Sequence, residues 1–173
     1  MSQLTHENTV FEEKKFPIVL VLDNITGPAN IGSLFRLADA FNIEKIIFCG
    51  TAPDLKSNRL RRTARSTTGT VMCEETESTT ETCISLAAEG YEILALEITE
   101  GSLAIDSISY NKFKKVALVL GNENMGIDEE VLKMVGYKLH ITMFGKNSSM
   151  NVAQAAGIAF FEITKSLQQF DEK

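Results

Sequence analysis

The sequence predicts an α/β protein with a mainly parallel sheet flanked by helices. Apolar runs of strand length alternate along the chain with segments whose apolar residues recur at helical spacing. Polar, glycine-bearing loops follow several of the apolar runs. This alternation is typical of βαβ units, in which a helix connects two parallel strands. The length of 173 residues suits one domain, with expected bounds 1–173 and an N-terminal arm over residues 1–15.

The first strand and helix show the pattern most clearly. Residues 16–22 (FPIVLVL) form a continuous apolar run, which is typical of a strand buried on both faces. After the turn residues Gly27 and Pro28, apolar side chains from Ile31 to Phe41 recur at helical spacing and predict a helix.

The later elements continue the alternation. Ser78 and Glu81 form a capping box that predicts a helix through about Ala88, and Asp128 can cap a helix through Val135. Further strands are expected at 45–49, 70–73, 91–96, 116–120 and 137–141, and a long amphipathic helix is expected from Asn151 to about Leu167. Ligands of such sheets bind in the loops that follow the strands.

The composition excludes several classes of protein. No apolar run approaches the roughly 20 residues that span a bilayer, and the N-terminus lacks the basic and apolar regions of a signal peptide. Three cysteines without a C-x-x-C pair argue against a disulfide scaffold and against a cysteine zinc site. From the cysteines we therefore expect a reduced cytoplasmic protein. The chain has only two histidines, so we also expect no metal.

Charge is segregated along the chain, although the net charge is −6. Residues 56–65 contain five basic residues and no acidic one, whereas residues 74–100 contain eight glutamates and no basic residue. The basic segment can be a solvated helix face, but phosphates would neutralise it, and we favour a nucleic-acid surface. The candidates for phosphate contacts are Arg59, Arg61, Arg62 and Arg65.

The loop after the first strand lacks the G-x-G-x-x-G fingerprint of dinucleotide-binding folds. Asn30 occupies a position where an N-cap belongs, and capping alone would explain it. Arg36 lies in the second turn of an otherwise apolar helix. It can be a solvated edge residue or a functional residue, and the residues of this loop do not decide between them.

Two later loops also carry candidate residues. Gly121 and Gly126 have the spacing of a P-loop, but Ile127-Asp128 replace the lysine and hydroxyl residue that bind triphosphate. The loop with Glu123 at its centre can hold a neutral or cationic ligand, or it is only a tight turn. Before the last helix, Ser149 or Asn151 can act as an N-cap, and the helix N-terminus also suits an anionic group.

Together the three loops resemble the signature motifs of the SpoU-type (TrmH-like) RNA ribose 2'-O-methyltransferases of the SPOUT superfamily. The resemblance extends from Asp23 to Gly157, and Thr142 and Met150 replace the Pro and Leu that are usual in the third motif. The matching residues are Asn30-x-Gly32-x-x-x-Arg36, Leu120-Gly121-x-Glu123-x-x-Gly126 and Ile141-x-Met143-x-Gly145-x-x-x-Ser149-x-Asn151-Val152.

The resemblance implies a C-terminal trefoil knot, a homodimer, and transfer of a methyl group from S-adenosylmethionine to a ribose 2'-hydroxyl of RNA, with tRNA favoured over rRNA. S-adenosylhomocysteine would be the product. By similarity, the catalytic residues would be Arg36, Asn30, Ser149, Asn151 and Glu123, and the cofactor would bind at Leu96, Gly121, Ile141, Ser149 and Met150.

Two alternatives to the enzyme are a non-catalytic RNA-binding protein that retains the fold and a nucleotide-binding α/β protein. The intact Arg36, Ser149 and Asn151 argue against the first, and the missing G-x-G-x-x-G and G-x-x-x-x-G-K-[ST] motifs argue against the second.

Overall fold

Seven parallel strands form one sheet in the computed structural model, which describes residues 11–147 and 149–171. The strand order is β3-β2-β1-β6-β4-β7-β5, and all the strand pairs in it are parallel. The strands are β1 (Phe16–Asp23), β2 (Ile43–Cys49), β3 (Cys73–Thr76), β4 (Glu92–Leu96), β5 (Leu103–Ala104), β6 (Val116–Gly121) and β7 (Tyr137–His140).

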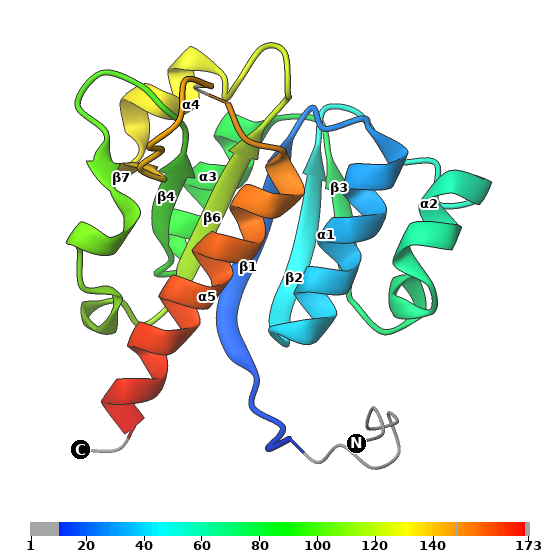
Figure 1. Cartoon of the computed structure of the whole chain (residues 1–173), viewed down its shortest axis with the longest axis horizontal. Helices are drawn as coiled ribbons and strands as arrows, with labels where there is room; N and C mark the ends of the chain where they lie inside the picture. Colours follow the sequence, from blue (N-terminus) through cyan, green and yellow to red (C-terminus); the bar gives the residue numbers. More distant parts are fainter. Residues whose placement is uncertain (1–10, 148, 172–173) are drawn as a thin grey trace.

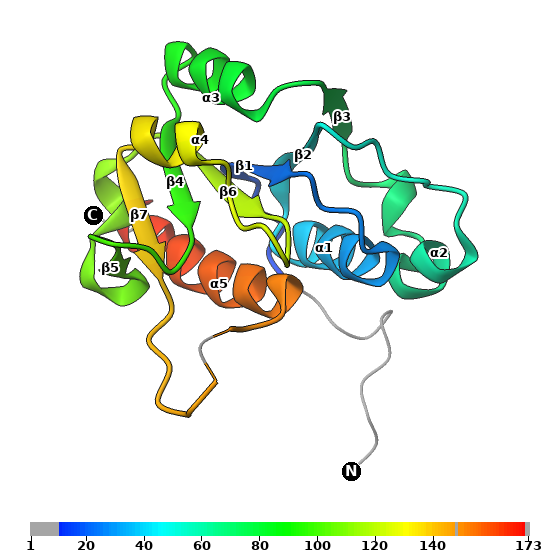
Figure 2. The same cartoon turned by 90° about the horizontal axis from the view of Figure 1, so that it is seen from above.

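Helices cover both faces of this sheet, as Figures 1 and 2 show. Helices α1 and α5 lie on one face and α3 and α4 on the other, while α2 lies beside α1. The predicted α/β class is therefore confirmed. The helices are α1 (Pro28–Ala40), α2 (Asn58–Ala64), α3 (Thr79–Ala88), α4 (Glu129–Met134) and α5 (Val152–Asp171).

Strand β1 contributes to two hydrophobic cores because its successive side chains point to opposite faces of the sheet. Ile18, Leu20 and Leu22 belong to the core beneath α1 and α5, and Val19 and Val21 belong to the core on the side of α3 and α4. All five are at most 1% exposed. The prediction that residues 16–22 form a strand buried on both faces is confirmed.

Several predicted boundaries differ from the structure, and one strand was not predicted. The strand expected at 70–73 is β3, three residues later, because residues 67–69 form a 3-10 turn and the Thr70 hydroxyl donates to Asp39 Oδ1 at 2.9 Å. Strand β3 lies at the edge of the sheet, where exposed residues such as Glu74 and Glu75 are tolerated. Because of these two glutamates, residues 73–76 do not form an apolar run, and the strand was predicted too early in the sequence. The two-residue strand β5 was not predicted, and α5 ends four residues later than expected.

The N-terminal arm predicted over residues 1–15 is only partly described. Residues 1–10 lie outside the described residues, and residues 11–15 precede β1 without regular secondary structure. The trefoil knot implied by the resemblance remains a prediction.

Asp23, at the carboxyl end of β1, fixes the start of two helices. Its side chain is 3% exposed, and Oδ1 accepts hydrogen bonds from the Thr79 hydroxyl at 2.7 Å and from Asn24 Nδ2 at 3.0 Å. Oδ2 accepts from the backbone N–H of Asp128 at 2.8 Å. A buried carboxylate needs such donors, so the starts of α3 and α4 are held at the end of β1.

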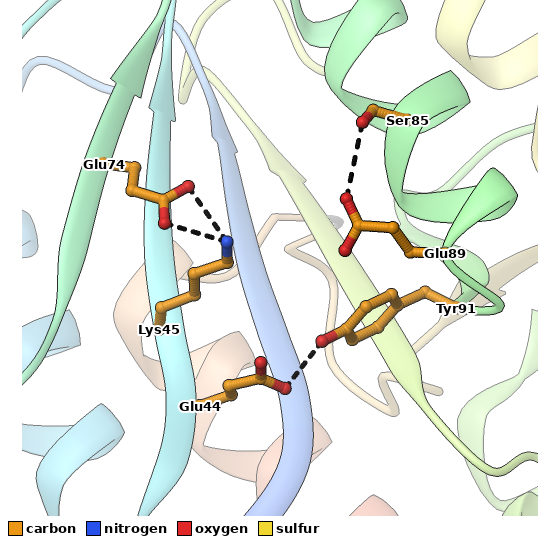
Figure 3. A network of polar contacts seen from close by, with 6 residues as sticks. All are labelled: Glu44, Lys45, Glu74, Ser85, Glu89 and Tyr91. Carbon is orange, nitrogen blue, oxygen red and sulfur yellow. Dashed lines mark hydrogen bonds and ion pairs between the residues drawn. The ribbon is translucent and has the colours of Figure 1, made fainter.

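A second polar network lies at the opposite, amino-terminal edge of the sheet (Figure 3). The Tyr91 hydroxyl donates to Glu44 Oε2 at 2.6 Å, and Lys45 Nζ pairs with both Glu74 oxygens at 2.9 Å. Burial and the hydrogen bond to Glu44 raise the pKa of the Tyr91 phenol, so it stays a donor at neutral pH. This network joins the beginnings of β2 and β4.

Within the described residues, no helix is long and apolar enough to cross a membrane. The same part of the chain contains no cluster of three or more His, Cys, Asp or Glu side chains that could hold a metal ion.

Gly32 allows α1 and α2 to pack with their backbones close together. A Cβ atom at this position would lie 2.7 Å from the Leu60 carbonyl oxygen and 2.8 Å from Thr63 Cβ. Both contacts are too short to persist, and neither partner is the flexible end of a long side chain. The glycine of the first motif therefore serves helix packing.

We predict that Gly32→Ala destabilises the protein by about 1–3 kcal/mol, because α2 must move away from α1. The control is Gly69→Ala, at a position where a Cβ atom would meet nothing within 4 Å. The control should change the free energy of unfolding by less than about 0.5 kcal/mol. Urea denaturation followed by circular dichroism measures both. Equal stability of the two variants would contradict the close packing of α1 and α2.

Candidate active site

A cavity of about 880 Å³ lies at the carboxyl end of the sheet. Its walls are the loops that follow β4, β6 and β7, together with the first turn of α5. All of the residues expected to bind the cofactor line this cavity: Leu96, Gly121, Ile141, Ser149 and Met150. Glu123 and Asn151 line it as well.

The loop after β6 is closed by its own backbone. Asn122 and Gly126 form an antiparallel bridge, with N···O distances of 3.1 and 2.8 Å. A Cβ atom on Gly121 would lie 2.2 Å from the Gly126 carbonyl carbon, and Gly126 has a φ of +72°. Both positions therefore require glycine. The interpretation of this segment as a tight turn is confirmed, and the turn holds Glu123 at the cavity.

A chain of side-chain hydrogen bonds connects the three motif loops. Asn151 Oδ1 accepts from the backbone N–H groups of Ala153 and Gln154 at 3.0 and 3.3 Å. Asn151 Nδ2 donates to Asn30 Oδ1 at 2.9 Å, and Asn30 Nδ2 donates to Glu123 Oε1. The sequence separations are 121 and 93 residues. The structure thus brings together three of the five residues expected to be catalytic.

The capping role considered for Asn30 is wrong. Helix α1 begins at Pro28, its N-cap is Gly27, and no side chain caps it. Asn30 is therefore inside the first turn, and its amide is available to Glu123 and Asn151. The capping role of Asn151 is confirmed by its bonds to the first turn of α5. The Ser149 hydroxyl instead donates to Asn147 Oδ1 at 3.2 Å.

The cavity has an acidic lining. Glu97 and Glu123 contribute carboxylates, and no lysine or arginine occurs among the described residues that line it. Glu97 accepts from the backbone N–H groups of Ile98 at 3.1 Å and Ile127 at 3.3 Å, so it also holds the end of the β6 loop. Such a lining favours a ligand of net positive charge.

Glu97 and His140 were not among the predicted site residues. Both lie outside the three motifs, and both line the cavity. Glu97 directly follows the strand predicted at 91–96, and the loops that follow the strands were expected to bind ligands. His140 was predicted inside the strand 137–141, so no comparable signal marked it.

Arg36 does not line the cavity. It is exposed on α1, one turn after Gly32, which contacts α2. Residues three or four apart share a face of a helix, so Arg36 projects beside α2. Helix α2 and its C-cap present more exposed arginines, and we call this exposed set the basic surface. Its members are Arg36, Arg59, Arg61, Arg62 and Arg65.

Comparison with known proteins places these features in a family. The model of the SpoU rRNA Methylase family matches residues 17–161. The 23S rRNA (guanosine-2'-O-)-methyltransferase RlmB of Haemophilus ducreyi is 29% identical over 164 residues, which cover 91% of this chain and 63% of the relative.

Two solved structures resemble the fold. An AdoMet-bound rRNA methyltransferase from Sinorhizobium meliloti is 28% identical with a TM-score of 0.81, over 89% of this chain and 58% of that one. A structure described as giving insights into 2-OH methylation of C/U34 on tRNA is 26% identical with a TM-score of 0.75, over 88% of this chain and 97% of that one.

The chain spans about two thirds of the length of the curated relatives it matches. The family model nevertheless extends from β1 to the middle of α5 and includes all three motif loops. The chain therefore belongs to the SpoU rRNA Methylase family.

Proposed function

We propose that this protein transfers a methyl group from S-adenosylmethionine to a ribose 2'-hydroxyl of RNA. The observation that carries the proposal is the hydrogen-bonded chain of Asn151, Asn30 and Glu123 at the rim of a cavity that suits a cationic ligand. The names of the Haemophilus ducreyi and Sinorhizobium meliloti relatives support the reaction and the cofactor. We infer one methyltransferase domain, acting in the cytoplasm.

The cavity fits the cofactor in charge and size. S-adenosylmethionine carries a sulfonium and an ammonium group against one carboxylate, and supplies a methyl group on an activated leaving group. Backbone groups of Leu96, Gly121, Ile141 and Met150, together with Ser149, would hold it. Since Glu123 is engaged by Asn30, we assign it to ordering the loops rather than to proton transfer.

Arg36 would stabilise the alkoxide that develops as the hydroxyl proton leaves. A guanidinium group has a pKa above about 12 and is a poor base, whereas its planar donors suit an oxyanion. The proton would pass to solvent as the bond from oxygen to the methyl carbon forms and the bond from that carbon to the cofactor sulfur breaks, which would leave S-adenosylhomocysteine. Asn30 would position Arg36 or the RNA. The remaining arginines of the basic surface would bind RNA phosphates.

The substrate class is RNA, and we favour tRNA over rRNA. The solved structure described as giving insights into 2-OH methylation of C/U34 on tRNA supports this preference, since it is 26% identical with a TM-score of 0.75.

We further propose a homodimer formed through α5. A groove on this helix is lined by Met150, Gln154, Gly157, Ile158 and Phe161. Ile158 is 40% and Phe161 59% exposed, and the two lie one turn apart. Met150 lines both this groove and the cavity. Pairing at this face would bring a second copy of the chain next to the cavity. Arg36 of each protomer lies outside the cavity of its own chain, and in the dimer it would reach the cavity of the other protomer.

We predict that Arg36→Ala lowers methyl transfer by about 10²- to 10³-fold, because one donor to a developing oxyanion is lost. Its affinity for S-adenosylhomocysteine should stay at the wild-type value, since Arg36 does not line the cavity. The assay measures labelled methyl transferred to unmodified tRNA and rRNA pools, with nuclease mapping to the ribose.

The same assay separates the alternatives. Arg36→Lys keeps the charge and should retain part of the activity. Cofactor binding without transfer to either RNA pool would favour the non-catalytic RNA-binding protein. Unchanged turnover of Arg36→Ala would remove Arg36 from the mechanism.

We predict that Phe161→Asp converts the dimer to a monomer and abolishes methyl transfer, because a charge would be buried in an apolar interface. Ile84→Asp is the matched control, since Ile84 is 55% exposed on α3, on the other face of the sheet. Sedimentation velocity measures the mass of each variant. A monomeric Phe161→Asp variant with full activity would contradict the proposed role of the dimer.

A further inference from the structure

Ser102 and His140 make a contact at the wall of the cavity that none of the three motifs includes. His140 ends β7, lines the cavity, and places Nδ1 3.0 Å from Ser102 Oγ. The residue pairs Leu103–Leu139 and Ala104–His140 of the parallel strands β5 and β7 hold the two segments side by side. The contact is thus built into the sheet.

The hydrogen bonds of Ser102 determine which nitrogen of His140 carries the proton. Ser102 Oγ donates its single hydrogen to the Thr99 carbonyl oxygen at 2.7 Å. In this arrangement Ser102 Oγ acts as the acceptor toward His140 Nδ1, which lies 3.0 Å away. The Nδ1 atom of the neutral imidazole then carries the proton, and Nε2 carries the lone pair.

Nε2 is the ring atom left available to a ligand. Within the described residues, no hydrogen bond involves His140 Nε2, and the side chain is half-buried at the cavity. A fixed acceptor at a cavity wall selects ligands that present an N–H or O–H group. The adenosyl group offers both kinds of donor, in its 6-amino group and its ribose hydroxyls.

We propose that His140 is a cofactor-binding residue whose Nε2 accepts a hydrogen bond from the adenosyl group, and that Ser102 is the positioning residue that fixes its tautomer. This inference rests on the proposed function, since it takes the cavity as the cofactor site. It adds two residues outside the family motifs and assigns the chemistry of the cavity wall at the ends of β4 and β7.

Isothermal titration with S-adenosylhomocysteine tests the role of His140 without requiring activity. His140→Phe keeps a planar ring but removes the acceptor, and it should weaken binding about three- to tenfold. His140→Gln places an oxygen near the position of Nε2 and should recover part of the affinity. Wild-type affinity in His140→Phe would overturn the assignment, whereas no binding to the wild-type protein would overturn the proposed function itself.

The donor on the ligand can be identified with S-inosylhomocysteine, which lacks the 6-amino group. If His140 accepts a hydrogen bond from the 6-amino group, His140→Phe will bind S-inosylhomocysteine as tightly as the wild-type protein does. If His140 accepts a hydrogen bond from a ribose hydroxyl, His140→Phe will lose affinity for S-adenosylhomocysteine and S-inosylhomocysteine equally. Both results support the acceptor role and distinguish its two sources.

The tautomer is measured by ¹⁵N–¹H correlation of the imidazole ring. The chain has only two histidines, so in a His6→Ala variant the only imidazole signals are those of His140. We expect protonated Nδ1 in the free protein and a shift of the Nε2 resonance on addition of S-adenosylhomocysteine. A protonated Nε2 in the neutral ring would contradict the inference.

Ser102→Ala and Ser107→Ala form a matched pair for the positioning role. Ser107 Oγ donates to the Ala104 carbonyl oxygen at 2.6 Å, three residues back, as Ser102 does to Thr99. Ser102→Ala should give a mixture of His140 tautomers and weaker S-adenosylhomocysteine binding, and Ser107→Ala should change neither. Identical tautomer populations in the two variants would exclude Ser102 as the positioning residue.

Discussion

The candidate site depends on the hydrogen-bonded chain from the first turn of α5 through Asn151 and Asn30 to Glu123. The donor-to-acceptor direction of these hydrogen bonds is fixed at the N-terminus of α5. Backbone N–H groups can only donate, so Asn151 must turn its oxygen toward the helix and its Nδ2 toward Asn30. Asn30 then accepts with its oxygen and donates to Glu123. The N-terminus of α5 thereby orients two amides and one carboxylate on three loops.

The scaffold holds these loops at fixed positions. Asp23 ties the end of β1 to the starts of α3 and α4, which places the end of the β6 loop. Gly121 and Gly126 let that loop close on its own backbone, and Gly32 lets α2 approach α1. The glycines in the first two motifs are therefore explained by close packing and backbone conformation.

Much of the fold could be predicted from the sequence because its central strands are buried on both faces. The apolar run 16–22 and the capping residues Ser78 and Asp128 gave correct elements. Strand β3 was misplaced, since an edge strand pairs on one side and tolerates glutamates. Local patterns also cannot show which loops meet: Asn30 fits an N-cap by position, and only the tertiary structure brings it to Glu123.

Arg36 shows a further limit of local reasoning: a motif residue lies outside the cavity of its own chain. His140 and Glu97 show the converse, because they line the cavity without belonging to a motif. Their chemistry depends on hydrogen bonds to Ser102 and to the Ile127 backbone, which are distant in the sequence.

A double-mutant cycle of Asn30→Ala and Asn151→Ala tests the central claim that the three loops act as one unit. S-adenosylhomocysteine affinity would be measured for the wild-type protein, both single variants and the double variant. If the chain of hydrogen bonds organises the site, the double variant will bind S-adenosylhomocysteine about as tightly as the single variant with the lower affinity. The coupling energy will then be about 0.5–3 kcal/mol. Losses that add to within about 0.5 kcal/mol would show that Asn30 and Asn151 act independently and would contradict the account.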